Sequence, residues 1–241
     1  MAVSSDSQVI VISGANRGIG LELARQALAR GHHVIAGARN PKESRGLQEL
    51  RDSHPSSAAR VHVLELDITS EDNIGRFVRE LKNIGVDHID VLINNAGVYS
   101  DDDGRATEVI PLVVLQTFET NAVGPIRLTQ ALLPFLRRSR QPRIANTASL
   151  MGSITDNSSG GSLAYRMSKT AVNMFTKTLA IEEPGLAVIA LHPGWVKTDM
   201  GGANAPVSVS ESAEGLLNII LRAKPTESGK FFNYDGRELP W

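Results

Sequence analysis

Short apolar runs alternate with amphipathic stretches along almost the whole chain. Apolar runs bounded by glycine or polar residues predict strands, and longer stretches with apolar positions at helical spacing predict helices. Strands are expected at residues 9–12, 33–36, 61–64, 89–93, 143–146 and 188–191, with a short last one at 231–232. Helices are expected at residues 19–29, 70–83, 113–138, 163–181 and 211–222, with Ser70 as an N-cap.

The predicted strands are apolar on both faces and are separated by helices. This pattern predicts an α/β fold, a doubly wound parallel sheet of about seven strands with helices on both faces. No internal repeat or low-complexity linker divides the chain, so residues 1–241 are expected to form a single domain. Two Gly/Ser-rich stretches, residues 152–162 and 201–210, are expected to be mobile loops.

Composition narrows the possible chemistry. The 241 residues include no cysteine, which excludes disulfides, thiolate zinc sites and cysteine nucleophiles, and no metal site is expected. A net charge of -1 gives no field that favours nucleic acid or an anionic membrane. Residues 1–8 lack the features of a signal peptide, and no apolar run is long enough to span a bilayer, so a cytoplasmic location is expected.

A glycine-rich turn separates the first predicted strand from the first helix. Gly14, Gly18 and Gly20 follow a GxxxGxG spacing, and glycines there let the backbone approach a diphosphate closely. The helix that follows offers free N–H groups and the positive end of its dipole. No lysine follows to hold a γ-phosphate, so a dinucleotide is expected; a turn without a ligand is the alternative.

The end of the second strand bears on which dinucleotide binds. Folds of this kind that use NAD carry an acidic residue there for the ribose 2′-hydroxyl, but this strand ends in Arg39 and Asn40. Arg39 and Arg17 are both expected near the 2′ position, where guanidinium groups suit a phosphate. The sequence therefore predicts NADP(H) rather than NAD(H), with two solvated surface arginines as the alternative.

Polar and small residues end the third and fourth strands. Asp67 either accepts a hydrogen bond from the adenine amino group or caps a turn. The stretch 94–97 (Asn-Asn-Ala-Gly) lets the backbone pass close to the adenosine ribose, and its asparagine amides can tie neighbouring strands together.

Tyr165 and Lys169 lie four residues apart in a predicted helix, which places both side chains on one face. A nearby ammonium lowers the pKa of a tyrosine and makes it a better acid–base group. Ser149 follows the fifth strand at the carboxyl edge of the sheet, where its hydroxyl can hydrogen-bond a substrate carbonyl; Ser153 and Thr147 are competitors for this role. Asn121 lies in an apolar helical stretch and either holds a water behind the lysine or is a satisfied core residue.

Together these motifs, in this order and with His192-Pro193-Gly194, resemble the short-chain dehydrogenase/reductase family over essentially the whole chain. The details resemble a subgroup that holds the sniffer-type carbonyl reductases and the C-factor-like proteins. Ser13 replaces the family's usual threonine, Ala148 stands where serine is common, and the stretch from Ser149 to Tyr165 is longer than usual.

The resemblance implies a Rossmann-type fold with a cofactor half at about residues 1–140 and a catalytic half at about 141–241. It implies that Tyr165 is the acid–base residue, that Lys169 anchors the nicotinamide ribose, that Ser149 orients the carbonyl and that Asn121 supports a water relay. The implied cofactor-binding residues, besides Tyr165 and Lys169, are Gly14, Asn16, Arg17, Gly18, Ile19, Gly20, Arg39, Asp67, Ile68, Asn94, Ala96, Gly97, Pro193, Gly194, Val196 and Thr198.

The expected activity is NADPH-dependent reduction of a ketone or aldehyde to an alcohol, reversibly, on a small-molecule substrate. A dinucleotide-binding regulatory or signalling protein of the C-factor type is the alternative, and an epimerase or dehydratase on the same fold is a third. The resemblance implies a monomer or a homo-oligomer, because long helices such as residues 113–138 form dimer faces in many family members while some sniffer-type reductases are monomers.

Overall fold

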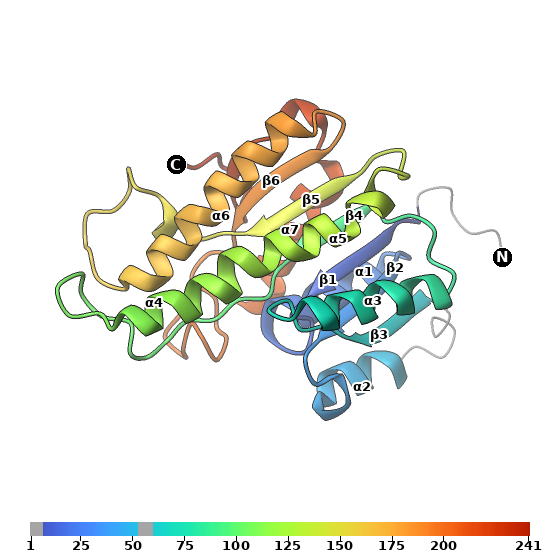
Figure 1. The fold of residues 1–241 in the computed structure, drawn as a ribbon, viewed down its shortest axis with the longest axis horizontal. Helices are drawn as coiled ribbons and strands as arrows, with labels where there is room; N and C mark the ends of the chain where they lie inside the picture. Colours follow the sequence, from blue (N-terminus) through green and yellow to red (C-terminus); the bar gives the residue numbers. More distant parts are fainter. Residues whose placement is uncertain (1–6, 53–59) are drawn as a thin grey trace.

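A parallel sheet forms the centre of the fold (Figure 1). The computed structural model describes residues 7–52 and 60–241, and this part of the chain contains seven strands in the order β3-β2-β1-β4-β5-β6-β7, with every neighbouring pair parallel. The strands are β1 (Val9–Ser13), β2 (His33–Ala38), β3 (Val61–Glu65), β4 (Val91–Asn94), β5 (Arg143–Thr147), β6 (Ala187–His192) and β7 (Lys230–Asn233). The strand order reverses between β1 and β4, which is where such sheets bind ligands.

Helices cover both faces of the sheet, as the alternating pattern predicts (Figure 1). Apolar side chains of α1 (Gly18–Ala29), α2 (Arg45–Asp52) and α7 (Val209–Arg222) share one core cluster with the sheet. Those of α3 (Glu71–Asn83), α5 (Gly124–Leu136) and α6 (Leu163–Glu182) share the other. The predicted fold class is therefore confirmed.

The predicted helix at residues 113–138 is interrupted. The structure has α4 (Pro111–Phe118), a π-helical turn η3 (Glu119–Val123) and then α5. Pro125 has no amide hydrogen, so the helical hydrogen bond to the carbonyl of residue 121 cannot form. Such a π-helical turn often occurs at a functional site, and this one contains Asn121.

Smaller differences concern boundaries and short elements. Ser70 caps α3 as predicted, since its Oγ accepts a hydrogen bond from the Asn73 amide at 3.2 Å. The fourth strand begins later than predicted and includes Asn94, and α7 begins inside the stretch that was expected to be a loop. The helix α2 was not predicted. Short 3₁₀ turns add η1 (Pro41–Glu43), η4 (Leu150–Gly152) and η5 (Pro225–Glu227).

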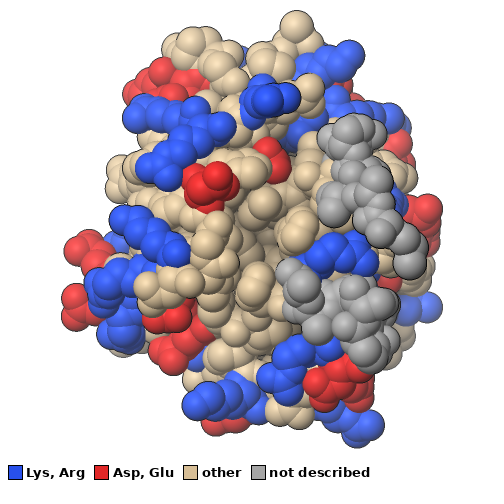
Figure 2. All heavy atoms as spheres, turned by 90° about the vertical axis from the view of Figure 1, so that its right-hand side faces the viewer, with Lys and Arg blue, Asp and Glu red and all other residues tan. Residues whose placement is uncertain are grey.

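The amino-terminal ends of the strands lie at the right of Figure 1, and Figure 2 looks onto this face. Lys and Arg side chains are interspersed there with Asp and Glu (Figure 2). A hollow of about 830 Å³ on this side is lined by polar groups that bond within the protein: the Arg143 guanidinium donates to Ala223 O at 2.9 Å, and Asp90 accepts from the Val9 amide at 2.8 Å. None of the described helices is long and apolar enough to cross a membrane.

Candidate active site

The main groove lies at the opposite edge, where the carboxyl ends of the strands meet. Its volume is about 1020 Å³, and it runs from the end of β3 past β2, β1 and β4 to α6. Fifteen of the predicted site residues line it: Gly14, Asn16, Arg17, Gly18, Ile19, Gly20, Arg39, Asp67, Ile68, Ala96, Gly97, Tyr165, Lys169, Pro193 and Thr198.

The glycine turn between β1 and α1 has the conformation that its sequence predicts. Gly14 has φ +67°, and a Cβ there would lie 2.8 Å from the Cα of Ala96. At Gly20, in the first turn of α1, a Cβ would lie 2.3 Å from the Gly14 carbonyl oxygen. The turn is thus closed tightly on β4, and α1 directs its amino terminus into the groove.

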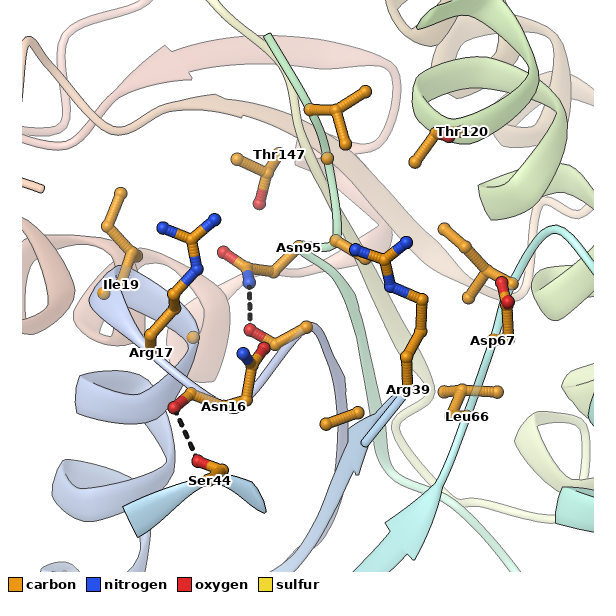
Figure 3. A pocket seen from close by; sticks show the side chains of 18 of the residues that line it. Asn16, Arg17, Ile19, Arg39, Ser44, Leu66, Asp67, Asn95, Thr120 and Thr147 are labelled. Atoms are coloured by element: carbon orange, nitrogen blue, oxygen red, sulfur yellow. Dashed lines mark hydrogen bonds between the residues drawn. The ribbon is translucent and has the colours of Figure 1, made fainter. Parts of the chain in front are cut away.

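The two predicted phosphate-binding arginines have different surroundings. Figure 3 shows Arg17 and Arg39 on either side of Asn95, with Asp67 beyond Arg39. Both arginines are exposed; Arg17 forms an ion pair with Asp199, which comes from the segment after β6, while Arg39 lies at the end of β2. Arg39 is therefore the better placed of the two for a phosphate near β2, because Arg17 already pairs with a carboxylate.

Residues around α2 also line this end of the groove, and the sequence reasoning missed them. Asn40 precedes η1, and Ser44 and Arg45 lie at the start of α2, which was not predicted as a helix. The Ser44 hydroxyl donates to the Asn16 carbonyl at 2.8 Å and so joins this segment to the glycine turn (Figure 3). A serine just before a short stretch with two leucines is the capping signal that could have located the helix.

Asp67, Asn94 and Asn95 make hydrogen bonds within the protein at or below the groove. The Asp67 carboxylate accepts from the Thr69 amide at 2.9 Å and the Thr69 hydroxyl at 2.7 Å, which is the turn-capping alternative, although Asp67 also lines the groove. Contrary to the expectation of cofactor contact, Asn94 is 3% exposed and does not line the groove. Its amide donates to Thr129 Oγ1 and Asn146 Oδ1, while Asn95 donates to the Ser13 and Gly14 carbonyls, so both tie elements together.

Three polar side chains meet where the groove reaches α6. The Ser149 side chain lies close enough to Tyr165 to lower its pKa, and the Lys169 Nζ lies 5.5 Å from the centroid of the Tyr165 ring. Ser149 is buried, does not line the groove, and accepts from the Met151 amide at 3.2 Å, whereas its competitor Thr147 does line the groove. The Lys169 ammonium donates to the Thr147 carbonyl at 2.7 Å. Ser153 is excluded from this group because its hydroxyl donates to the Trp241 carbonyl at 3.0 Å.

The surroundings shift the pKa of both titratable groups. Burial raises the pKa of Tyr165 to about 12; the Ser149 side chain opposes this rise and Tyr99 adds to it. Burial lowers the pKa of Lys169 to about 8. We expected the Lys169 ammonium to lower the pKa of Tyr165, but burial outweighs any such effect here. At neutral pH the phenol therefore carries its proton.

Asn121 projects from the π-helical turn toward the same place but lies behind the groove. Its Oδ1 accepts from the Val98 amide at 2.8 Å, and its Nδ2 donates to the Val98 carbonyl at 2.9 Å and to Ser168 Oγ at 3.0 Å. Both amide hydrogens are used, so the side chain matches the alternative of a satisfied core asparagine. A Cβ on Gly97 would lie 3.3 Å from Asn121 Oδ1 and 3.6 Å from Lys169 Nζ.

The segment after β6 brings Pro193 and Thr198 to the groove but not Gly194 or Val196. Gly194 has φ +85°, and a Cβ there would lie 2.9 Å from the Tyr234 ring. Val196 is buried and pairs with Val207 in an isolated bridge. These two residues shape the turn on which Pro193 and Thr198 lie.

Comparisons with known proteins bear on the family and the fold. A family model described as short chain dehydrogenase matches residues 8–206. The protein C-signal of Myxococcus xanthus is 44% identical over 161 residues, which are 66% of this chain and 96% of that protein. Carbonyl reductase Sniffer of D. melanogaster is 35% identical, with a TM-score of 0.89 over 98% of this chain and 100% of that one. An NADPH-bound carbonyl reductase from chicken fatty liver is 31% identical, with a TM-score of 0.89 over 98% and 99%. The chain belongs to the short-chain dehydrogenase family, as its motifs predict.

Proposed function

We propose that this protein reduces a ketone or aldehyde to an alcohol with NADPH. The observation that carries the proposal is the placement of Tyr165 and Lys169 on the groove where it reaches α6, with the Ser149 side chain next to Tyr165. Two hydroxyls at that point can hold one carbonyl oxygen. The likeness to the solved carbonyl reductases of D. melanogaster and chicken supports the same reaction class.

The groove fits a dinucleotide. The lack of room for a Cβ at Gly14 and Gly20 lets the backbone of the turn come close to a diphosphate, and the first N–H groups of α1 have no partner within the helix and can bind it. Arg39 suits the 2′-phosphate that distinguishes NADPH from NADH, and no carboxylate ends β2. Lys169 would donate to the nicotinamide ribose, and Pro193 and Thr198 would lie beside the carboxamide.

Bound NADPH supplies the hydride. Ser149 donates a hydrogen bond to the substrate carbonyl and polarises it, and Tyr165 transfers its phenolic proton to the oxygen as negative charge develops there. The phenol is protonated at neutral pH, which is the state that a proton donor needs, although its raised pKa of about 12 makes it a weaker acid than a free tyrosine. The Lys169 ammonium then stabilises the phenolate that remains. Asn121 acts as a positioning residue that holds Val98 and the π-helical turn against Ser168.

The test is oxidation of NADPH in the presence of quinones, aldehydes and diketones, followed by its absorbance. The variant Tyr165→Phe keeps the ring but lacks the acid, so it should bind NADPH with unchanged affinity and lose turnover by a factor of about 10² to 10⁴. Full turnover in this variant would remove Tyr165 from the mechanism.

The likeness to C-signal supports a second candidate, a dinucleotide-binding regulatory or signalling protein without useful catalysis. Tight NADPH binding with no turnover on any carbonyl of the panel would favour it. The presence of Tyr165, Ser149 and Lys169 together favours the catalytic function, because a regulator needs no proton donor there.

A further inference from the structure

The helix that carries Tyr165 begins without a cap of its own. The residue before α6, Ser162, has φ +47°, and its side chain makes no capping hydrogen bond. The first N–H groups of a helix have no partner within the helix and are stabilised by an acceptor from elsewhere. In α6 these groups include the backbone amide of Tyr165 itself.

Acceptors for these amides come from the loop between β4 and α4, residues 95–110. Asp103 Oδ1 accepts from the Ala164 amide at 2.9 Å, and Asp103 Oδ2 accepts from the Tyr165 amide at 2.8 Å. The Gly104 carbonyl accepts from the Leu163 amide at 3.2 Å. The first three amides of α6 are thus all bonded by two consecutive residues that lie about sixty positions earlier in the chain.

The same loop also contacts the Tyr165 side chain. The ring of Tyr99 packs edge-on against the ring of Tyr165, with 5.3 Å between the centroids, and its hydroxyl is 2.8 Å from Ser162 Oγ. The Asp103 amide in turn donates to the Ser100 carbonyl at 3.1 Å, which folds the loop into a turn that aims the carboxylate at α6.

We propose that Asp103 is a positioning residue for the reaction: its carboxylate caps α6 from the loop and fixes the place of Tyr165. Each carboxylate oxygen takes one amide, and a negative charge at the start of a 20-residue helix is stabilised by the helix dipole. The proposal rests on the proposed function, since it assigns Asp103 to the placement of the proton donor.

Kinetics of Asp103→Ala and Asp103→Asn test the effect on Tyr165. Small displacements of a reacting group cost up to about 10² in rate, so Asp103→Ala should lower kcat about ten- to hundredfold for every carbonyl in the panel, with the Kd for NADPH unchanged. In Asp103→Asn one amide oxygen remains as an acceptor, so the kcat of this variant should lie between those of the wild type and Asp103→Ala. A fall confined to KM for some substrates would make Asp103 a substrate contact and overturn the proposal.

A second helix-cap variant distinguishes an effect on the position of Tyr165 from a general loss of stability. Ser208 caps α7, because its Oγ accepts from the Glu211 amide at 3.1 Å. Ser208→Ala should lower the melting temperature by an amount similar to that caused by Asp103→Ala but leave kcat unchanged. If both variants lowered kcat equally, Asp103 would have only the structural role of any cap.

Hydrogen–deuterium exchange tests the cap without any turnover. In Asp103→Ala, a peptide that spans residues 163–170 should take up deuterium faster at its first amides, while a peptide from α7 should not change. Unchanged exchange at the start of α6 would refute the proposal even if the enzyme is active. If wild type reduces no carbonyl, the proposed function fails, and the exchange result alone then decides whether Asp103 holds the Tyr165 segment.

Discussion

Acid should destabilise this protein in part through His192, a histidine at the end of the central sheet. His192 ends β6, next to the groove residue Pro193, and its Nδ1 is buried without a hydrogen-bond partner in the described part of the chain. Burial lowers the pKa of His192 from 6.5 to about 4, although Asp156 and Asp235 oppose the shift. The neutral imidazole is therefore the form that the folded protein holds.

Proton linkage gives the direction and the magnitude of the change in the free energy of unfolding with pH. Between pH 6.5 and 4 the unfolded chain binds a proton at this site and the folded chain does not, so stability is present above pH 6.5 and falls as the pH falls. The full shift corresponds to about 3 kcal/mol, of which about 2 kcal/mol is lost between pH 7.5 and pH 5. That is a large part of the net stability of an ordinary domain.

The substitution His192→Gln removes the titration while keeping a polar side chain. Urea denaturation, followed by circular dichroism at pH 7.5 and pH 5, gives the free energy of unfolding of both proteins. Other groups titrate in both proteins, so the two losses of unfolding free energy between pH 7.5 and pH 5 are compared. The wild type should lose about 2 kcal/mol more than the variant. Equal losses would show that His192 is protonated in the folded protein and would refute this reasoning.

Two further predictions concern the groove. Gly20→Ala should abolish NADPH binding in a fluorescence titration, because its Cβ would lie 2.3 Å from the Gly14 carbonyl oxygen; Gly75→Ala, which meets only the Arg79 side chain at 3.7 Å, is the matched control and should bind normally. Arg39→Ala should raise the Kd for NADPH about ten- to hundredfold and leave the Kd for NADH unchanged, as expected for loss of a charge-assisted phosphate contact. Arg17→Ala should have a smaller effect because Arg17 is paired with Asp199; an equal effect would contradict the division of roles.

Features that depend on neighbouring residues could be predicted from the sequence. Runs such as Val9–Ser13 are buried on both faces of the sheet, and the glycines that follow impose their own backbone conformation. The α2 helix was missed because only Leu47 and Leu50 are buried in it, which gives little periodic signal over eight residues. The break in the long helix was missed because Pro125 also suits a helix start, and the sequence does not say which of these roles it takes.

The sequence by itself determined the alternating strands and helices, the glycine turn and the helical spacing of Tyr165 and Lys169, because each depends on residues that are neighbours in the chain. Only the tertiary structure decided that Asn121 binds the Val98 backbone, that Arg17 pairs with Asp199 and that Asp103 caps α6. These contacts join residues separated by 23, 182 and 62 positions. Hydrogen bonds over such separations exist only after the helices have packed on the sheet, so no local pattern encodes them.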